Sequence, residues 1–148
     1  MLACISTLKG RVLFGLAVLL LLLGLWELLP GTRLRAKQAA LIEWAKSGQA
    51  GDFRTEFAAA NYQDQWGHTA ADVVEKVKVA RYAFPGLTIT EGEPEFDRDG
   101  GAASVRQSID LRGVDEPRSA VFTFRWKRES WTPWSWRLES VAAPGLEF

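Results

Sequence analysis

The sequence holds few side chains whose type and spacing suit acid–base chemistry. The lone histidine, His68, follows Tyr62 and Asp64 in a polar loop, where it could serve as a base beside a pocket. Asp72 is the second candidate base. It stands three residues after Thr69, however, which is the spacing of a helix-capping pair. His68 and Asp72 are therefore the two catalytic candidates, and a structural role is the simpler interpretation of each.

One polar position interrupts an apolar row. Between residues 103 and 111, every second residue is apolar except Gln107. Its amide could bind a ligand, but a bulge or a bond to a neighbouring backbone would also satisfy it, and we favour that interpretation. If the interior of the domain is hollow, the candidate pocket residues are Gln107, Phe122, Phe124 and Trp136.

Metal and cofactor chemistry has no recognisable motif in this sequence. The single cysteine, Cys4, lies before a long apolar segment, so the domain beyond that segment can form neither a disulfide nor a cysteine-ligated metal site. A thiol-free domain suits an oxidising compartment without requiring one. We expect no metal and no cofactor.

Tryptophans interleaved with basic residues near the C-terminus raise the question of nucleic-acid binding. Strand alternation places Trp126 and Trp136 inward and their basic neighbours outward, so the two kinds of side chain do not share a face. The formal net charge is zero as well, and we expect no binding to nucleic acid. Trp131 and Trp134, in the loop between these strands, could instead dock a partner or enter a membrane interface.

Residues 12–29 form the clearest pattern in the sequence, that of a membrane-spanning helix. They read VLFGLAVLLLLLGLWELL, with Glu27 as the one charged residue, and as a helix they extend roughly 27 Å, close to the thickness of a bilayer core. We expect a single transmembrane helix after a short tail, 1–11, with Pro30 and Gly31 ending the helix. A cleaved signal peptide is the alternative because the start is basic, but no small-residue cleavage site follows.

Charge nearly balances across this segment. Lys9 and Arg11 precede it together with the amino terminus, and Arg33, Arg35 and Lys37 follow it. The short tail and the thiol-free domain favour an extracytoplasmic domain. The expected protein is thus a single-pass membrane protein, with the bilayer as the partner of its apolar segment.

Beyond the anchor, apolar spacing predicts three helices. The first covers residues 33–48, the second is a brief helix that Asp52 caps, and the third begins at the Thr69 cap and ends before Pro85. Each carries one apolar stripe and cannot bury that stripe alone. The helices therefore need a further layer to pack against.

The sequence then alternates between apolar and polar residues, which predicts four antiparallel strands. A turn is expected at 97–101, with loops at 114–119 and 129–135. A sheet that is apolar on one face offers the surface that the helices need. We therefore expect a two-layer α+β domain over residues 33–143, with three helices packed on a curved four-stranded sheet, and a C-terminal tail at 144–148.

This order, the turn DRDGGAASV at 97–105 and the closing WSWRLESV at 134–141 resemble the nuclear transport factor 2-like superfamily. The resemblance covers roughly residues 33–141 and implies a curved sheet wrapped around helices as a cone. The superfamily includes ketosteroid isomerases, polyketide cyclases, noncatalytic binding domains and membrane-anchored scaffold domains of bacterial secretion machines. Neither stretch is a catalytic motif, so the resemblance implies a fold rather than an activity.

The anchor and the lack of a recognisable catalytic set predict a membrane-anchored binding or assembly module. Its partner would be a second copy of the chain or another envelope protein, contacted through the sheet face or through Trp131 and Trp134. The alternative is an isomerase- or cyclase-like enzyme, or a small-ligand binder, that uses the cone pocket with His68 or Asp72 as base. A deep cavity that holds a perturbed acid or histidine would mark the alternative.

Overall fold

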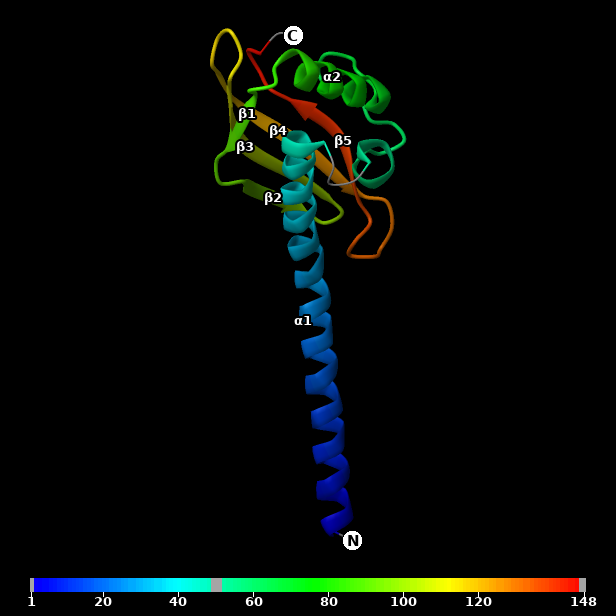
Figure 1. Cartoon of the computed structure of the whole chain (residues 1–148). Coiled ribbons are helices and arrows are strands. Elements are labelled where there is room, and N and C mark those ends of the chain that lie inside the picture. The colour runs from blue at the N-terminus through cyan, green and yellow to red at the C-terminus, as the bar shows by residue number, and fades with distance from the viewer. Residues whose placement is uncertain (1, 49–51, 147–148) are drawn as a thin grey trace.

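The computed structural model describes residues 2–48 and 52–146. A long helix, α1 (Leu2–Ser47), projects from a domain that gathers around its C-terminal end (Figure 1). A single π-helical turn, η1 (Phe53–Phe57), and a second helix, α2 (Ala70–Ala83), come before the sheet. The helices therefore precede the strands in the chain, as the sequence predicts.

The apolar segment and the first predicted domain helix form one continuous helix. Our expectation that Pro30 and Gly31 end the helix is wrong, because α1 passes through both. Proline removes one helical hydrogen bond, but the domain supports the helix at this point. Trp136 Nε1 donates to the Pro30 carbonyl oxygen at 2.9 Å, and the rings of Trp26 and Trp131 stack with centroids 5.4 Å apart.

The helix ends where the sequence predicts. Gly48 has φ +70°, and its N–H donates to the Trp44 carbonyl oxygen at 2.7 Å. The last turns bury Leu34, Leu41 and Trp44, whereas the segment from 12 to 25 exposes its large apolar side chains. One helix therefore has a core-facing section and an apolar section that the domain does not cover.

The two other helical segments begin with the predicted caps. Asp52 accepts a backbone N–H at the start of η1, which is as brief as expected. Thr69 and Asp72 form a complete capping box at the start of α2. The number of helices still differs from the prediction, because the first predicted domain helix is the end of α1.

The sheet has five antiparallel strands where the sequence predicts four. They are β1 (Thr88–Glu91), β2 (Glu95–Asp99), β3 (Ala102–Arg112), β4 (Arg118–Arg128) and β5 (Trp136–Ala142). The expected first strand is divided into β1 and β2, which pair with successive parts of β3. The division lies at residues 92–94. A Cβ on Gly92 would lie 2.2 Å from the Ser108 hydroxyl oxygen, and Pro94 has no N–H for the ladder.

The remaining strands follow the predicted meander. Gly100, with φ +57°, lies in the turn between β2 and β3. The apolar side chains predicted to face inward on β3 and β4 pair across the two strands. Val105 lies opposite Phe124 and Ala103 opposite Trp126, and all four are buried. A register shift between Arg125 and Trp126 bends β4 against β5.

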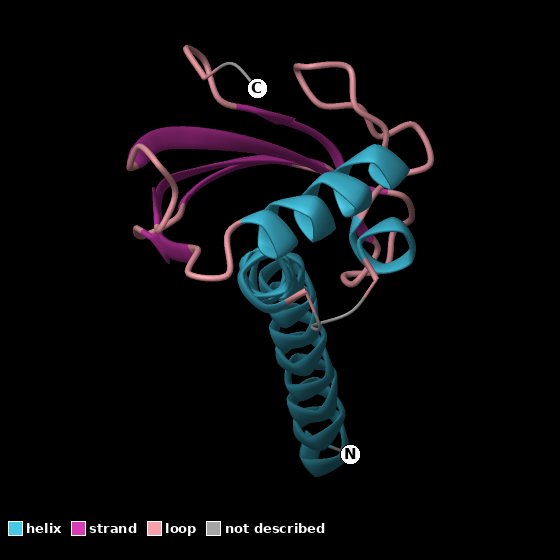
Figure 2. Cartoon of the chain, turned by 45° about the horizontal axis from the view of Figure 1, so that its top comes forward, coloured by secondary structure: helices cyan, strands magenta, loops and turns pink. Residues whose placement is uncertain are grey.

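The helices lie on one side of the curved sheet. Figure 2 shows α2 and the C-terminal end of α1 on the side toward which the sheet curves. Most of the largest core side chains come from α1, η1, β4 and β5: Leu34, Phe57, Trp126, Trp136 and Leu138 are each at most 2% exposed. The architecture is a two-layer α+β cone, and its helical layer is continuous with the projecting helix.

Candidate functional site

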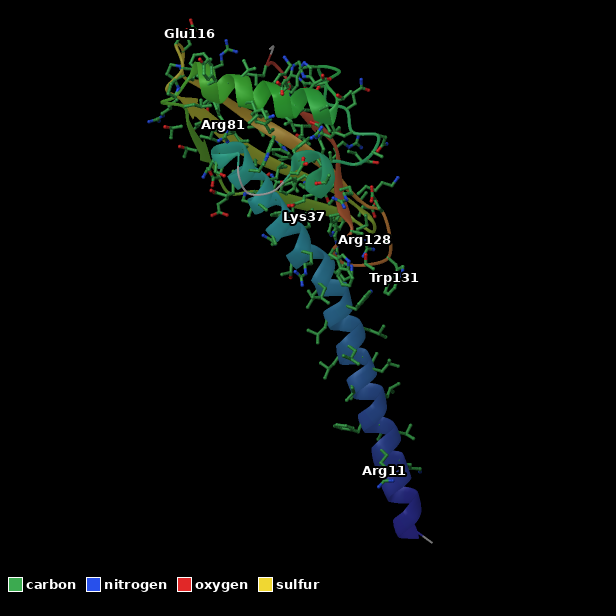
Figure 3. The ribbon with its side chains drawn as sticks, turned by 45° about the vertical axis from the view of Figure 1, so that its right-hand side comes forward. Arg11, Lys37, Arg81, Glu116, Arg128 and Trp131 are labelled. Carbon is green, nitrogen blue, oxygen red and sulfur yellow. The ribbon has the colours of Figure 1, made fainter. Side chains whose placement is uncertain are left out.

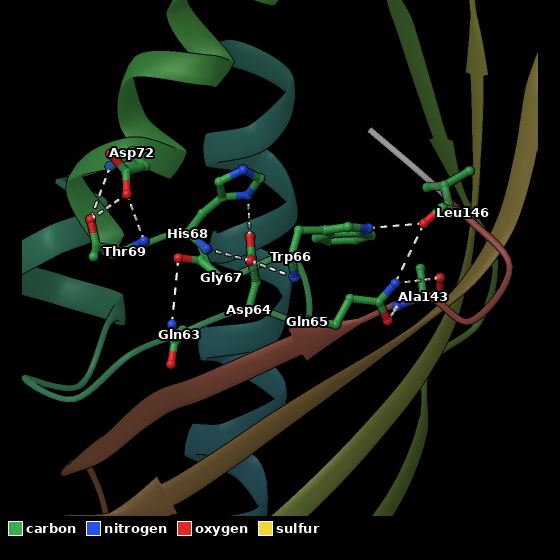
Figure 4. Close-up of polar contacts among 10 residues, drawn as sticks. All are labelled: Gln63, Asp64, Gln65, Trp66, Gly67, His68, Thr69, Asp72, Ala143 and Leu146. Carbon is green, nitrogen blue, oxygen red and sulfur yellow. Dashed lines mark hydrogen bonds and ion pairs between the residues drawn. The ribbon is translucent and has the colours of Figure 1, made fainter.

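The loop before α2 pairs the lone histidine with a carboxylate (Figure 4). His68 Nδ1 lies 2.9 Å from Asp64 Oδ2. Asp64 Oδ1 accepts the backbone N–H groups of Trp66 and His68 at 3.0 and 2.8 Å. The side chain of Asp64 is 5% exposed and that of His68 is 22% exposed. The carboxylate therefore orients a partly exposed imidazole, an arrangement that a general base can use.

Tyr62, at the start of the same loop, is buried. Its ring meets Phe53 edge-on with centroids 5.3 Å apart. Burial raises the pKa of the Tyr62 phenol, and the charge of Asp64 adds to the rise. The phenol therefore stays protonated at neutral pH and can act only as a hydrogen-bond donor or acceptor.

The loop is also fastened to the C-terminal segment. Gln65 Nε2 donates to the Ala143 carbonyl oxygen at 3.0 Å, and Gln65 Oε1 accepts the Ala143 N–H at 2.8 Å. Trp66 Nε1 donates to the Leu146 carbonyl oxygen at 2.9 Å (Figure 4). These bonds give the loop a structural role beside any chemical one.

Asp72 is engaged at the start of α2. Its Oδ2 accepts the Thr69 N–H at 2.9 Å and the Thr69 hydroxyl at 2.8 Å. These bonds, the backbone one first, lower the pKa of the Asp72 carboxyl. A carboxylate stabilised in its charged form is a weaker base, so the geometry favours capping over general-base catalysis.

Gln107 belongs to a buried hydrogen-bonded chain that joins α1 to the sheet. Gln38 Nε2 donates to Gln107 Oε1 at 2.9 Å, and Gln107 Nε2 donates to the Gly92 carbonyl oxygen at 2.9 Å. Trp126 Nε1 donates to Gln38 Oε1 at 3.0 Å. Both glutamine side chains are buried. The Gln107 amide thus has protein partners on both sides, one of them the neighbouring backbone.

The three aromatic pocket candidates differ in how deeply they are buried. Phe124 and Trp136 are buried in the core, whereas Phe122 is only partly buried and stacks on Phe124 with centroids 6.2 Å apart. Phe122 and Gln107 face each other across β3 and β4. Of the four candidates, Phe122 is thus the one whose side chain a ligand could reach without displacing the core.

Two hollows on the surface of the described residues bear on these candidates. One of about 480 Å³ opens on the outer face of the sheet, between β3, β4 and the C-terminal segment; its walls include Arg106, Ser108, Val121, Thr123 and Leu146. The other, of about 230 Å³, lies between α1 and η1, with Arg33, Lys37, Phe57 and Trp134 among its walls. Neither hollow is lined by His68, Asp72 or Gln107.

Lys37 lines the smaller hollow, where contacts with η1 hold its side chain. Its Nζ donates to the Glu56 carbonyl oxygen and lies 5.8 Å from the centre of the Phe57 ring. Burial, and then the nearby charge of Arg137, lower the pKa of the Lys37 ammonium. The lysine therefore fastens α1 to η1.

The loop between β4 and β5 exposes two indoles. Trp131 is 73% exposed and Trp134 is 61% exposed. Figure 3 shows Trp131 and Arg128 beside α1, where the helix leaves the domain. These interaction candidates are thus accessible, and Trp131 lies against a residue of the apolar segment, Trp26.

Sequence reasoning missed one partner in these arrangements, Gln38. Gln38 occupies an inward position of the helical stripe, four residues after Leu34 and three before Leu41. That position is itself a signal of a buried polar group. Asp64, by contrast, is visible in the sequence as a neighbour of His68, four residues before it.

Comparison with solved structures places the fold. The chain is similar to a protein of unknown function with a cystatin-like fold from Nostoc punctiforme, with TM-score 0.57 and 12% identity over 78% of this chain and 92% of that one. It is similar to a proposed dehydratase of the nuclear transport factor 2-like family from Streptomyces avermitilis, with TM-score 0.55 and 14% identity over 78% and 97% of the two chains. It is also similar to the CaMKII hub from S. rosetta, with TM-score 0.53 and 15% identity over 78% and 95%.

Comparison of the sequence with family models and curated proteins does not assign the chain to a family. No family model and no curated protein matches the sequence. At these identities, structural likeness shows the fold alone. The chain therefore has the cystatin-like, nuclear transport factor 2-like α+β fold, joined to an N-terminal helix that is long and apolar enough to cross a membrane.

Proposed function

We propose that the protein is a single-pass membrane protein whose domain is a binding and assembly module. The observation that carries this proposal is the position of the larger of the two hollows described above. The larger hollow opens on the outer face of the sheet, whereas the packed core and the Gln38–Gln107 pair occupy the inner face. We propose a second copy of the chain as the partner on the outer face, with another envelope protein as the alternative.

The anchor is supported by α1. The helix from Lys9 to Ser47 contains a window of mean hydropathy 2.5, none of which is buried in the domain. A bilayer would cover this surface, which would otherwise promote aggregation. We propose that the domain is extracytoplasmic, because a domain without thiols suits an oxidising compartment. Cys4 would then stay unreactive toward a membrane-impermeant maleimide in intact cells and react after lysis.

Pairing of two copies is supported by the outer face itself. Val121 is 48% exposed at the larger hollow, opposite Ser108 in the ladder. Charges of both signs occur on this face, including the pair Lys127–Glu139 at 3.8 Å. Such a mixture lets two copies approach without strong repulsion, and a twofold pairing would bring the same patch together from both.

The test is crosslinking of the full chain in detergent micelles. Val121→Cys in a Cys4→Ser background should form a disulfide-linked dimer under mild oxidation. Tyr82→Cys is the matched control, since Tyr82 is 90% exposed on α2. A monomer by light scattering, together with equal crosslinking at both positions, would overturn pairing through this face.

A second candidate function rests on the Asp64–His68 pair. An imidazole held by a buried carboxylate can act as a base, and one structural neighbour is a proposed dehydratase. A screen of small carbonyl compounds, read from the NMR signals of each compound, tests this function. Binding that disappears in Phe122→Ala and His68→Gln but persists in Trp134→Phe would favour the enzyme or ligand-binding function.

A further inference from the structure

Four arginines meet around α1 just past its apolar segment. Arg33 and Arg35 belong to the helix. Arg98 of β2 places Nη1 3.8 Å from the point where a Cβ on Gly31 would lie. Arg128 of β4 has its guanidinium carbon 5.7 Å from the ring of Trp136, the side chain that binds the Pro30 carbonyl oxygen. We call Arg33, Arg35, Arg98 and Arg128 the arginine collar.

Strand alternation explains how β2 contributes to the collar without bringing its acidic residues. Phe96 and Arg98 pair with Val105 and Ala103, which are buried, so both point toward the helices. The acidic residues on either side of Arg98 point to the opposite face. Arg35 packs over the Phe96 ring at 4.4 Å, which ties the two elements at this level.

The collar keeps a positive excess. Among the side chains that the structure describes, no carboxylate lies within 4 Å of the nitrogens of Arg33, Arg35 or Arg128. The Nε of Arg128 is buried without a hydrogen-bond partner among those residues. Glu27 is the only acidic residue from position 12 to position 35. A phosphate would therefore meet more positive than negative charge here.

Exposed indoles lie beside α1 on the N-terminal side of the arginine collar, next to the end of the apolar segment. Trp131 stacks on Trp26, which lies three residues before the end of the apolar segment, or about 4.5 Å along the axis. Trp134 is exposed in the same loop. Indoles favour the boundary between hydrocarbon and headgroups, and guanidinium groups bind phosphate just beyond it.

We propose that the collar and the loop containing Trp131 and Trp134 bind the headgroups of anionic phospholipids in the membrane that α1 crosses. This inference rests on the proposed anchor. The indoles lie in the interface, and the guanidinium groups contact lipid phosphates. The domain is thereby held against the bilayer in one orientation, with the outer face of the sheet left free for a partner.

Measuring the depth of spin labels in the bilayer distinguishes failure of this inference from failure of the proposed anchor. The chain is placed in vesicles of phosphatidylcholine with 30% phosphatidylglycerol, each sample carrying one spin label at Leu21→Cys, Trp134→Cys or Tyr82→Cys in a Cys4→Ser background. We expect position 21 in the hydrocarbon, 134 in the interface and 82 in water. A buried label at 21 with a water-exposed label at 134 overturns the inference and leaves the anchor. A water-exposed label at 21 overturns the anchor.

The collar itself is tested by lipid selectivity. Spin-labelled phosphatidylglycerol should associate with the wild-type chain more strongly than phosphatidylcholine, and the preference should fall about fivefold for each arginine removed in Arg98→Gln and Arg128→Gln. Arg112→Gln with Arg118→Gln is the matched control from the opposite ends of β3 and β4. Figure 3 shows Glu116, between these strands, far from Arg128. Equal selectivity of the collar and control variants, with both folded by circular dichroism, overturns the proposal.

Discussion

The indole nitrogen of Trp136, on the last strand, donates a hydrogen bond to the carbonyl oxygen of Pro30, on the helix that leaves the domain. The two residues are 106 positions apart. They meet where α1 changes from an uncovered apolar helix to a core helix, so this bond fixes the domain to the apolar part of α1 without an intervening loop.

Replacing Trp136 by phenylalanine should lower the free energy of unfolding by about 2 kcal/mol. The Pro30 carbonyl would stay buried without its donor, and the smaller ring would leave a cavity. Urea denaturation of the full chain in detergent micelles, followed by near-ultraviolet circular dichroism, measures this loss. Trp134→Phe is the control and should change the value by less than about 0.5 kcal/mol, because that side chain is exposed. Equal effects of both variants would contradict the role of the bond.

The Gln38–Gln107 pair should show energetic coupling. Gln107→Leu leaves the Gln38 amide nitrogen and the Gly92 carbonyl oxygen without their Gln107 partner, at a cost of roughly 3 kcal/mol. The double variant with Gln38→Leu should cost at least about 1 kcal/mol less than the sum of the two single variants. If Gln107 instead serves a ligand, the single variant would keep its stability and lose binding.

The cap at the start of α2 should make stability depend on acid pH. The folded-state pKa of Asp72 is lowered by its bonds to Thr69, so its contribution is present above the ordinary carboxyl pKa and is lost as pH falls through the lowered value. Melting temperatures of the wild type and Asp72→Asn should therefore differ at pH 7 and converge in acid, once the pH is below the lowered pKa of Asp72. A difference that stays constant down to that pH would exclude the carboxylate as its cause.

Two glycine positions should differ sharply in their tolerance of alanine. Gly113 has φ +82°, and an added Cβ would lie 2.0 Å from the Gly86 carbonyl oxygen; Gly100 has φ +57° with open space around it. Gly100→Ala should cost about 1 kcal/mol for the left-handed backbone alone. Gly113→Ala should cost at least twice as much, because a backbone atom must also move. Urea denaturation compares the two variants directly.

Local patterns were enough to predict much of the fold. The apolar run at 12–29, the caps at Asp52 and Thr69, the glycine at the end of α1 and the inward rows of the strands all depend on residues within a few positions of each other. Helical and strand periods of this kind are visible in a single sequence. Among the site candidates, the same patterns placed Asp72 at a cap and Gln107 on the inner face of the sheet.

Tertiary structure alone decided how these parts are joined. Pro30 reads as a helix end, yet the helix continues because Trp136 and Trp131 support it from strands and loops far along the chain. Likewise, the division of the first strand depends on Ser108 across the ladder, and the arginine collar depends on β2 and β4 reaching the same level of α1. Contacts between distant residues leave no periodic trace in the sequence, so packing rather than local propensity joined the apolar helix to the domain.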